Sequence, residues 1–536
     1  MPNRTKDEVF QLVKSLEKSE KRNFKLFVNR LGGARKGRTE TAPVGPSMVE
    51  DDLKVVTLFD ALDKMEAYDE EGLLRRNPSI KKQQLSNLKA QLFRQILSSL
   101  RLIRDENNID LQLHEEMDYA KILYNKALYL QSLKMLERIK EHARTYHQLS
   151  YVLQALTFEK KIESLHITRS MGNRAEQLAR ETEKANEQWL MLGKLSNLAL
   201  QLYSWYIQMG HARDEKDVLA VKTFFETNLP PDARRVESFY EKLYLYQAHC
   251  WYHYILQDFL QFYRNTQKWV DLFEQDPAMK GIETVQYIKG VHNLLIAHFV
   301  LLNHEKFMPA LKAFEEFTQS ELGLRDTTTT IQSFVYLYIS KIDRHFMEGT
   351  FTEGLALVPE IEEKLQLYEI HLDLHRVLVF YYKIACLYFG SGDNEKAIEY
   401  LNKIIHWKVD LRTDLQCYAR LLHLIAHYEL GNDQLLEYLI KSVYRFMAKM
   451  QNLSVVEEEV FKFLRKSFFL KPKQVKSSFV SLKEKLEKYE ESPLESRSFM
   501  YLDIISWLES KIQGKPVQEI MQLKYQADYQ RKKRLL

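Results

Sequence analysis

Apolar residues recur three or four positions apart along most of this 536-residue chain, which is the spacing of amphipathic helices. A clear example near the N-terminus is the stripe formed by Leu85, Leu88, Leu92 and Ile96. The chain holds only 17 Gly and 12 Pro, so it has few residues that favour turns and it should consist of long elements with short connections. The pattern predicts an all-α protein.

Residues 1–104 read as a small helical N-terminal module. Gly32 and Gly33 predict the end of its second helix, because glycine favours helix C-termini. Residues 32–47 hold four Gly and two Pro, so we expect a flexible linker loop there, with a helix resuming near Val49.

Charge is uneven along the chain. Residues 1–104 carry 21 basic and 14 acidic side chains, whereas the remainder carries 56 and 59. The N-terminal module is therefore the part of the chain that would attract an anionic partner. Arg35, Lys36 and Arg38 in the predicted loop are its candidate anion contacts.

The same loop has the spacing G-x-x-x-x-G-R-T, one residue short of a phosphate-binding P-loop. A working P-loop follows a buried strand and opens into a helix. Here an amphipathic helix precedes the loop, Pro43 and Pro46 follow it, and Arg38 replaces the lysine. We therefore expect no nucleotide site.

From residue 113 to 490 the chain reads as an array of paired helices, and residues 381–405 are its clearest unit. Gly390 and Gly392 predict the end of the first helix, and Asp393 can cap the second. Small and large apolar residues alternate on the facing surfaces of the two helices. The residues predicted to pack this unit are Tyr381, Ile384, Ala385, Tyr388, Gly392, Ala397, Leu401 and Ile404.

This unit resembles the tetratricopeptide repeat (TPR), in which small residues at the crossing of two helices are surrounded by large ones. The resemblance implies a TPR-like α-solenoid of roughly nine to eleven helical pairs. The basic N-terminal segment joined to such an array is similar to an uncharacterised family of bacterial repeat proteins, which implies no activity. Residues 492–536 read as a terminal helical pair that caps the array.

In peptide-binding TPR domains the inner face of each first helix lines a concave groove. The matching positions are Val379, Tyr382, Cys386 and Phe389, an apolar and aromatic set without the Lys and Asn side chains that hold a peptide carboxylate in such domains. We expect a groove ligand to be an apolar helix or extended segment. The alternative is that these four side chains simply pack against neighbouring helices.

Candidate chemistry is sparse. Three histidine pairs have the i, i+4 spacing of two metal ligands on one helix face, but none has the H-E-x-x-H form. Three scattered cysteines suit a reducing compartment, and the N-terminus lacks the apolar core of a signal peptide, so a cytoplasmic protein is expected. We predict no catalytic residues, no bound metal and no cofactor. The three pairs are His249/His253, His371/His375 and His423/His427.

These observations favour a non-enzymatic scaffold or adaptor that binds one or more proteins or peptides on the concave surface of the array. The alternative is a regulatory protein that binds nucleic acid through its basic N-terminal helices while the array senses a partner. That alternative predicts binding that weakens steeply as salt rises.

Overall fold

The computed structural model describes most of the chain, and every regular element in the described residues is a helix, with no strand among them. The all-helical prediction is therefore confirmed. None of the described helices is both long and apolar enough to cross a membrane. The described residues are 7–36, 47–102, 108–166, 173–407, 411–450, 453–467, 472–490 and 503–535, with four single residues between 491 and 502.

The chain divides into two compact units, Met1–Leu111 and Gln112–Leu536. In the first unit, the Phe24 and Phe59 rings meet at 4.6 Å and are fully buried, with Leu92 beside them in the same core. Its helices are α1 (Glu8–Ser15), α2 (Lys18–Lys36), α3 (Ser47–Lys64), α4 (Glu70–Arg76) and α5 (Lys82–Arg101).

The predicted helix end at Gly32 and Gly33 is wrong, because α2 continues through both glycines to Lys36. Glycine lowers helix propensity by about 1 kcal/mol, but it keeps its backbone N–H and so leaves the hydrogen-bond ladder intact. The rest of the predicted loop, 37–46, lies outside the described residues, and α3 begins directly after it.

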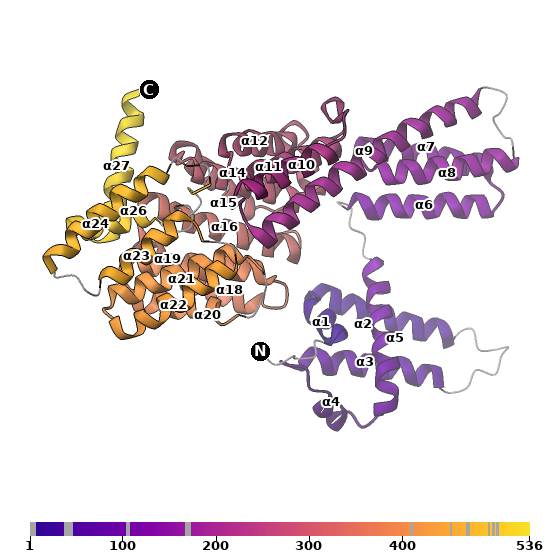
Figure 1. The fold of residues 1–536 in the computed structure, drawn as a ribbon. Coiled ribbons are helices and arrows are strands. Elements are labelled where there is room, and N and C mark those ends of the chain that lie inside the picture. Colours follow the sequence, from indigo (N-terminus) through magenta and orange to yellow (C-terminus); the bar gives the residue numbers. More distant parts are fainter. Residues whose placement is uncertain are drawn as a thin grey trace. The chain divides into compact units, whose positions relative to one another are not determined.

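The second unit runs from α6 to α27 (Figure 1). Its first helices are α6 (Ile109–Asn125), α7 (Tyr129–Thr145), α8 (Leu149–His166), α9 (Arg174–Met209), α10 (Glu215–Asn228), η2 (Ala233–Arg235), α11 (Phe239–Ile255), α12 (Phe259–Gln275), α13 (Ala278–Ile282), α14 (Thr284–Val300) and α15 (His304–Thr318). Its later helices are α16 (Thr327–Glu348), α17 (Phe351–Gly354), η3 (Leu355–Leu357), α18 (Val358–Leu367), α19 (Leu374–Ser391), α20 (Asn394–Ile405), α21 (Thr413–Glu429), α22 (Asp433–Lys449), α23 (Val455–Ser467), α24 (Pro472–Leu486), η4 (Glu487–Tyr489), α26 (Ile504–Gln513) and α27 (Val517–Leu535).

Helices of this unit pack mainly on their neighbours in sequence. Each of α11 and α14 contacts the long helix before it and the long helix after it, and alternate long helices such as α14 and α16 also touch. Two large apolar cores result, one centred on α9 to α12 and one running from α14 to α26.

The α19–α20 pair has the packing that its sequence pattern predicts. Tyr388 stacks on Tyr400 at 5.6 Å, Gly392 ends α19 at a φ of 94°, and the Asp393 carboxylate accepts the Lys396 N–H to cap α20. The five aliphatic residues between the two helices have no exposed surface, which makes this crossing a close one. They are Ile384, Ala385, Ala397, Leu401 and Ile404.

Gly390 does not end α19, which continues to Ser391. Gly390 instead allows α17 to pack closely on α19, because a Cβ at this position would lie 2.3 Å from the Phe351 ring. A glycine near a helix end can therefore mark a close contact between helices rather than a stop signal.

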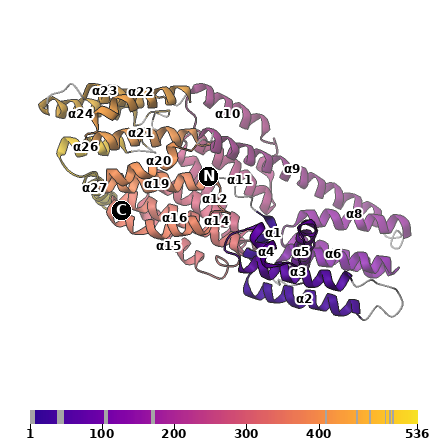
Figure 2. The ribbon, with the colours of Figure 1, turned by 90° about the horizontal axis from the view of Figure 1, so that it is seen from below.

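The C-terminal helices α26 and α27 pack on each other, but they contact different parts of the rest of the unit. α26 packs on α24 and buries Trp507, as a cap would. α27 instead turns back along the unit and lies against α16 and α19 (Figure 2). Gly349 allows this approach, because a Cβ there would lie 2.6 Å from the backbone of Gln522.

We predict that Gly390→Ala destabilises the protein by about 1–3 kcal/mol, because the Phe351 ring must move. Gly193→Ala is the matched control: it lies within α9 with no atom near the added Cβ, so better helix propensity should stabilise it by up to about 1 kcal/mol. Urea unfolding followed by circular dichroism measures both. Equal stability of the two variants would contradict close packing of α17 on α19.

Candidate functional site

One cavity of about 730 Å³ lies inside the second unit. Its wall takes residues from α9, α11, α14, α16 and α19, and α27 contributes Val517, Met521 and Tyr525. Five alternate long helices thus contribute to one interior space. Its aromatic wall residues include Tyr203, Tyr206, Trp251, Phe299, Tyr336 and Phe346.

One side of the cavity wall is formed where the end of α9 meets the segment before α21. The Arg412 backbone N–H donates to the Ile207 carbonyl at 3.4 Å, and its guanidinium lies 5.0 Å from the centre of the Tyr206 ring. Arg412 also donates two hydrogen bonds of 2.9 Å to the buried Asp414 carboxylate, which a Cβ on Gly210 would approach to 2.5 Å.

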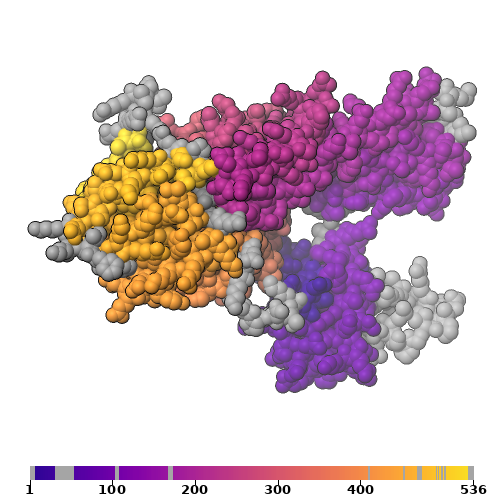
Figure 3. Space-filling view, in the orientation of Figure 1, coloured from indigo at the N-terminus to yellow at the C-terminus, as the bar shows by residue number. Residues whose placement is uncertain are grey.

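A second long-range contact joins the residues before α10 to the end of α22. The Arg213 guanidinium donates to the Met450 carbonyl, 237 positions later, at 3.3 Å. Figure 3 shows the magenta surface around α10 abutting the orange and yellow surface of the last third of the chain.

α27 is held to the cavity rim by polar contacts. The Thr352 N–H donates to the Gln518 side chain at 2.8 Å, and the Tyr525 hydroxyl lies 3.0 Å from His304 Nε2. His304 in turn lies 3.0 Å from the Glu348 carboxylate. The C-terminal helix is therefore part of the wall.

The four residues predicted to line a groove all lie on the cavity wall: Val379, Tyr382, Cys386 and Phe389. Tyr382 and Phe389 are nearly fully buried, and burial raises the pKa of Cys386 to about 12, so its thiol is protonated. The residues predicted to pack the α19–α20 pair lie elsewhere, between the two helices.

The expectation of an uncharged inner face is wrong. Lys289, Asn293, Arg376 and Lys383 also line the cavity. Arg376 and Lys383 lie three residues before and four residues after Val379, so they share its helix face and the spacing could have revealed them. Lys289 and Asn293 come from α14, and only the packing of α14 near α19 brings them to the same space.

Lys383 is neutralised on the wall by Asp343 of α16, with which it forms a buried ion pair. Burial raises the pKa of the Asp343 carboxyl, although Lys383 opposes the shift. The Lys383 ammonium also lies between two aromatic rings, 5.4 Å from Phe346 and 5.7 Å from Phe299.

The histidine pairs do not form metal sites in the part of the chain described. His249 stacks beside His253 at 5.9 Å, and burial lowers the pKa of His249 to about 4, so the ring is neutral. His423 meets His427 at 4.4 Å, and His427 Nδ1 pairs with the Asn432 amide. No described group of three or more His, Cys, Asp or Glu is placed to hold a metal ion.

The two histidines of the third pair lie in different environments. His371 is exposed at the end of the α18 region, whereas His375 lines the cavity.

The predicted anion contacts of the N-terminal module remain a prediction. Arg35 and Lys36 form the last turn of α2, but their side chains, like the whole of Arg38, lie outside the described residues. Several other basic residues of this unit are already paired with carboxylates within it. These pairs are Lys21–Asp63 at 2.8 Å, Lys25–Asp60 at 2.7 Å and Lys89–Asp7 at 2.6 Å.

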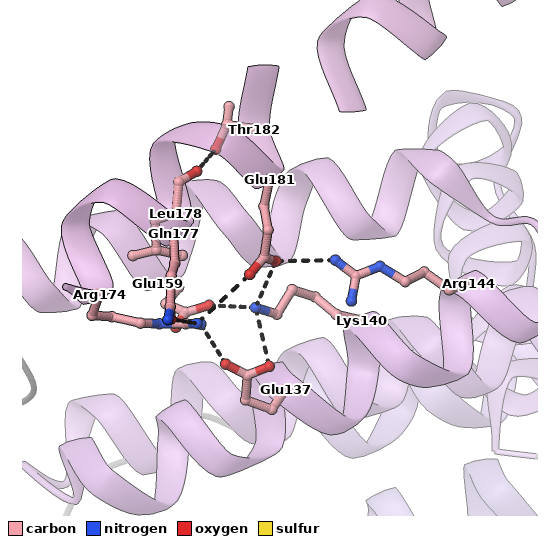
Figure 4. Close-up of polar contacts among 9 residues, drawn as sticks. All are labelled: Glu137, Lys140, Arg144, Glu159, Arg174, Gln177, Leu178, Glu181 and Thr182. Carbon is pink, nitrogen blue, oxygen red and sulfur yellow. Dashed lines mark hydrogen bonds and ion pairs between the residues drawn. The ribbon is translucent and has the colours of Figure 1, made fainter. Parts of the chain in front are cut away.

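A separate charged cluster joins α7, α8 and α9, and the sequence analysis missed it (Figure 4). The Lys140 ammonium is buried and lies 2.8 Å from Glu159, 3.1 Å from Glu137 and 3.4 Å from Glu181. Arg174 also bonds Glu159, which has no exposed surface.

This cluster is balanced, because Arg144 pairs with Glu181 at 3.0 Å and gives three cations for three carboxylates. Burial alone would raise the pKa of Glu159, but hydrogen bonds from Lys140 and Arg174 outweigh it and hold the pKa below its usual value. Because its charges pair with one another, the cluster links α7, α8 and α9 and offers no free charged group to a ligand.

No family model, no curated protein and no solved structure matches this chain.

We predict that Lys140→Met destabilises the packing of α7 to α9 by about 3–5 kcal/mol, because it leaves buried carboxylates without their central cation. The exposed Lys134 on the same helix is the control, and Lys134→Met should change stability by less than about 0.5 kcal/mol. Hydrogen exchange resolved along α7 to α9 measures both. Similar protection in the two variants would contradict a stabilising role for the cluster.

The cluster also predicts acid sensitivity. The pKa of Glu159 is lowered in the folded state, so its stabilisation is fully present above the ordinary carboxyl pKa of about 4.3 and is lost as pH falls through the lower folded value. Amide protection of α8 should therefore drop in acid. Protection that stays constant from neutral pH down to about pH 3 would be inconsistent with this linkage.

The packing of the end of α9 on the segment before α21 predicts that Gly210→Ala opens this side of the cavity wall. The added Cβ meets the Asp414 carboxylate, and Gly210 has a φ of 78°, so the end of α9 must move away from α21. Cys386 should then react several times faster with a thiol reagent, as measured by mass spectrometry. Gly431→Ala is the control, because it has a similar φ of 69° and no neighbour near its Cβ. Unchanged Cys386 reactivity in Gly210→Ala would show that this contact does not close this side of the cavity wall.

Proposed function

We propose that this protein is a non-enzymatic, TPR-like α-solenoid that binds a short segment of a protein partner in its interior cavity. The observation that carries the proposal is the convergence of five alternate long helices, α9, α11, α14, α16 and α19, on one space whose wall is rich in aromatic residues. A surface shared by several repeats is the usual way in which repeat proteins bind extended segments.

Two features support the solenoid. Each long helix of the second unit packs on its sequence neighbours, and α19 and α20 cross at small residues, Ala385 and Ala397, surrounded by larger ones. Both features are typical of stacked helical pairs.

The size and character of the cavity support a short segment as the ligand. A volume of about 730 Å³ lies within the range of roughly 300–1,000 Å³ in which proteins hold compact ligands. Helices rather than loops position its wall, so the ligand meets side chains that are already ordered, which lowers the entropy cost of binding.

The alternative, nucleic-acid binding by the N-terminal unit, gains no support from the described contacts. Lys21, Lys25 and Lys89 are engaged by carboxylates of the same unit, so binding a phosphate would require breaking these pairs.

The proposal is tested by selecting a random peptide library against the full-length chain and measuring the affinity of the selected peptides. Val379→Trp fills the cavity from its wall, and it should weaken binding at least about tenfold, equivalent to 1.4 kcal/mol. Leu374→Trp, at an exposed position of the same helix that does not line the cavity, should leave affinity unchanged.

Bound peptides should also protect Cys386 from thiol reagents, because its side chain lies on the cavity wall. Peptides that bind Val379→Trp as tightly as the parent protein, or that leave Cys386 reactive, would contradict the proposal.

A further inference from the structure

Lys289 is a cation without an anion. Its ammonium lies 4.1 Å from the centre of the Tyr203 ring and 5.4 Å from that of Trp251, on the wall of the cavity. Within the described part of the chain this ammonium has no hydrogen bond and no ion pair, and the only side-chain hydrogen bond at Lys289 is accepted by its backbone carbonyl, from Asn293. Burial, together with the nearby Arg376, lowers its pKa to about 8, so it is still mostly protonated at neutral pH.

An uncompensated cation in a buried aromatic site is costly, and folded proteins normally pair such a charge. The carboxylates of the neighbouring wall do not serve this purpose. Asp343 pairs with Lys383, and Asp414 pairs with Arg412. The end of the cavity around Lys289 therefore carries an excess of positive charge.

Arg376 adds to this charge from α19. Its guanidinium donates to Gln332 at 2.9 Å and to the Tyr336 hydroxyl at 3.0 Å, which fixes its orientation on the wall. Its ion pair with Asp373, at 2.6 Å, joins it to a carboxylate that is half exposed and does not line the cavity. These bonds use three of the five N–H groups of the Arg376 guanidinium, so the others can donate to a ligand.

Two neutral histidines complete the group. Nδ1 of His292 and Nδ1 of His375 are both buried and lack a hydrogen-bond partner in the described residues. The His292 ring stacks on Tyr336 at 4.3 Å. Burial lowers the pKa of both histidines to about 3, so each ring is neutral and has one N–H to donate.

We propose that Lys289, with Arg376 and His292, binds the carboxylate of a ligand whose apolar body fills the rest of the cavity. One unpaired cation matches the single charge of a carboxylate better than a phosphate dianion, and the remaining wall offers apolar side chains such as Phe299, Met347 and Val379. The carboxylate belongs either to a free apolar acid or to the C-terminus of a peptide, and the second source rests on the proposed function.

Matched probes separate the two sources. The free acids are hexanoate, phenylacetate and 4-phenylbutyrate, each compared at millimolar concentrations with its primary amide. The peptide is N-acetyl-Phe-Leu-Phe, compared with its C-terminal amide. Binding is measured by isothermal titration calorimetry and by protection of Cys386 from a thiol reagent.

The carboxylate form of at least one probe should bind at least about tenfold more tightly than its amide. Lys289→Met should remove this difference, while its melting temperature stays equal to or above that of the parent protein because a buried unpaired charge is gone. Lys268→Met is the control: Lys268 also lies over a tyrosine ring, 5.8 Å from Tyr246, but it is exposed and outside the cavity.

Each outcome decides between the hypotheses. Equal binding of acids and amides, no binding of any probe, or an acid preference that survives Lys289→Met overturns the carboxylate site. Carboxylate-dependent binding of the free acids but not of the peptide supports the site and argues against the proposed peptide ligand. Library peptides that bind in the cavity without needing a terminal carboxylate support the proposed function and overturn this inference.

Discussion

The interior of this protein depends on the contact between the end of α9 and the segment that leads into α21. Arg412 makes that contact with its backbone, with its guanidinium over Tyr206 and with its ion pair to Asp414. It does so at a φ of 48°, a left-handed conformation that a non-glycine residue holds only when its surroundings impose it. Gly210, opposite it, has no side chain that would keep the two segments apart. This contact therefore brings the end of α9 and the start of α21 together on one side of the cavity.

Two groups of buried charge in the second unit differ in whether their cations are paired with carboxylates. In the cluster of α7 to α9 every cation meets a carboxylate, and the result is a joint between three helices. In the cavity Lys383 and Arg412 are paired, whereas Lys289 rests on aromatic rings alone. Ring faces stabilise an ammonium by electrostatic attraction, but they do not replace the hydrogen bonds that it loses with water. The charge balance around Lys289 therefore differs from that of the helical cluster.

Local signals in the sequence were read correctly where the helices themselves determine the outcome. The spacing around Ala385 and Ala397 predicted the α19–α20 crossing, and Gly392 and Asp393 predicted its turn. The same reasoning failed for Gly32 and Gly390, because a glycine is compatible both with a helix end and with a helix interior that a neighbour approaches closely. The partner of Gly390, Phe351, lies on another helical pair, and no local pattern connects them.

Periodicity within single segments was enough to predict the helical class and to place Val379, Tyr382, Cys386 and Phe389 on one face of α19. Only the tertiary structure decided that this face lines a cavity, that α27 returns to complete its wall, and that Lys289 stands there without an anion. These features arise from contacts between residues more than a hundred positions apart, such as Arg213 with Met450 and Thr352 with Gln518. Such contacts join segments that no local pattern in the sequence relates to one another.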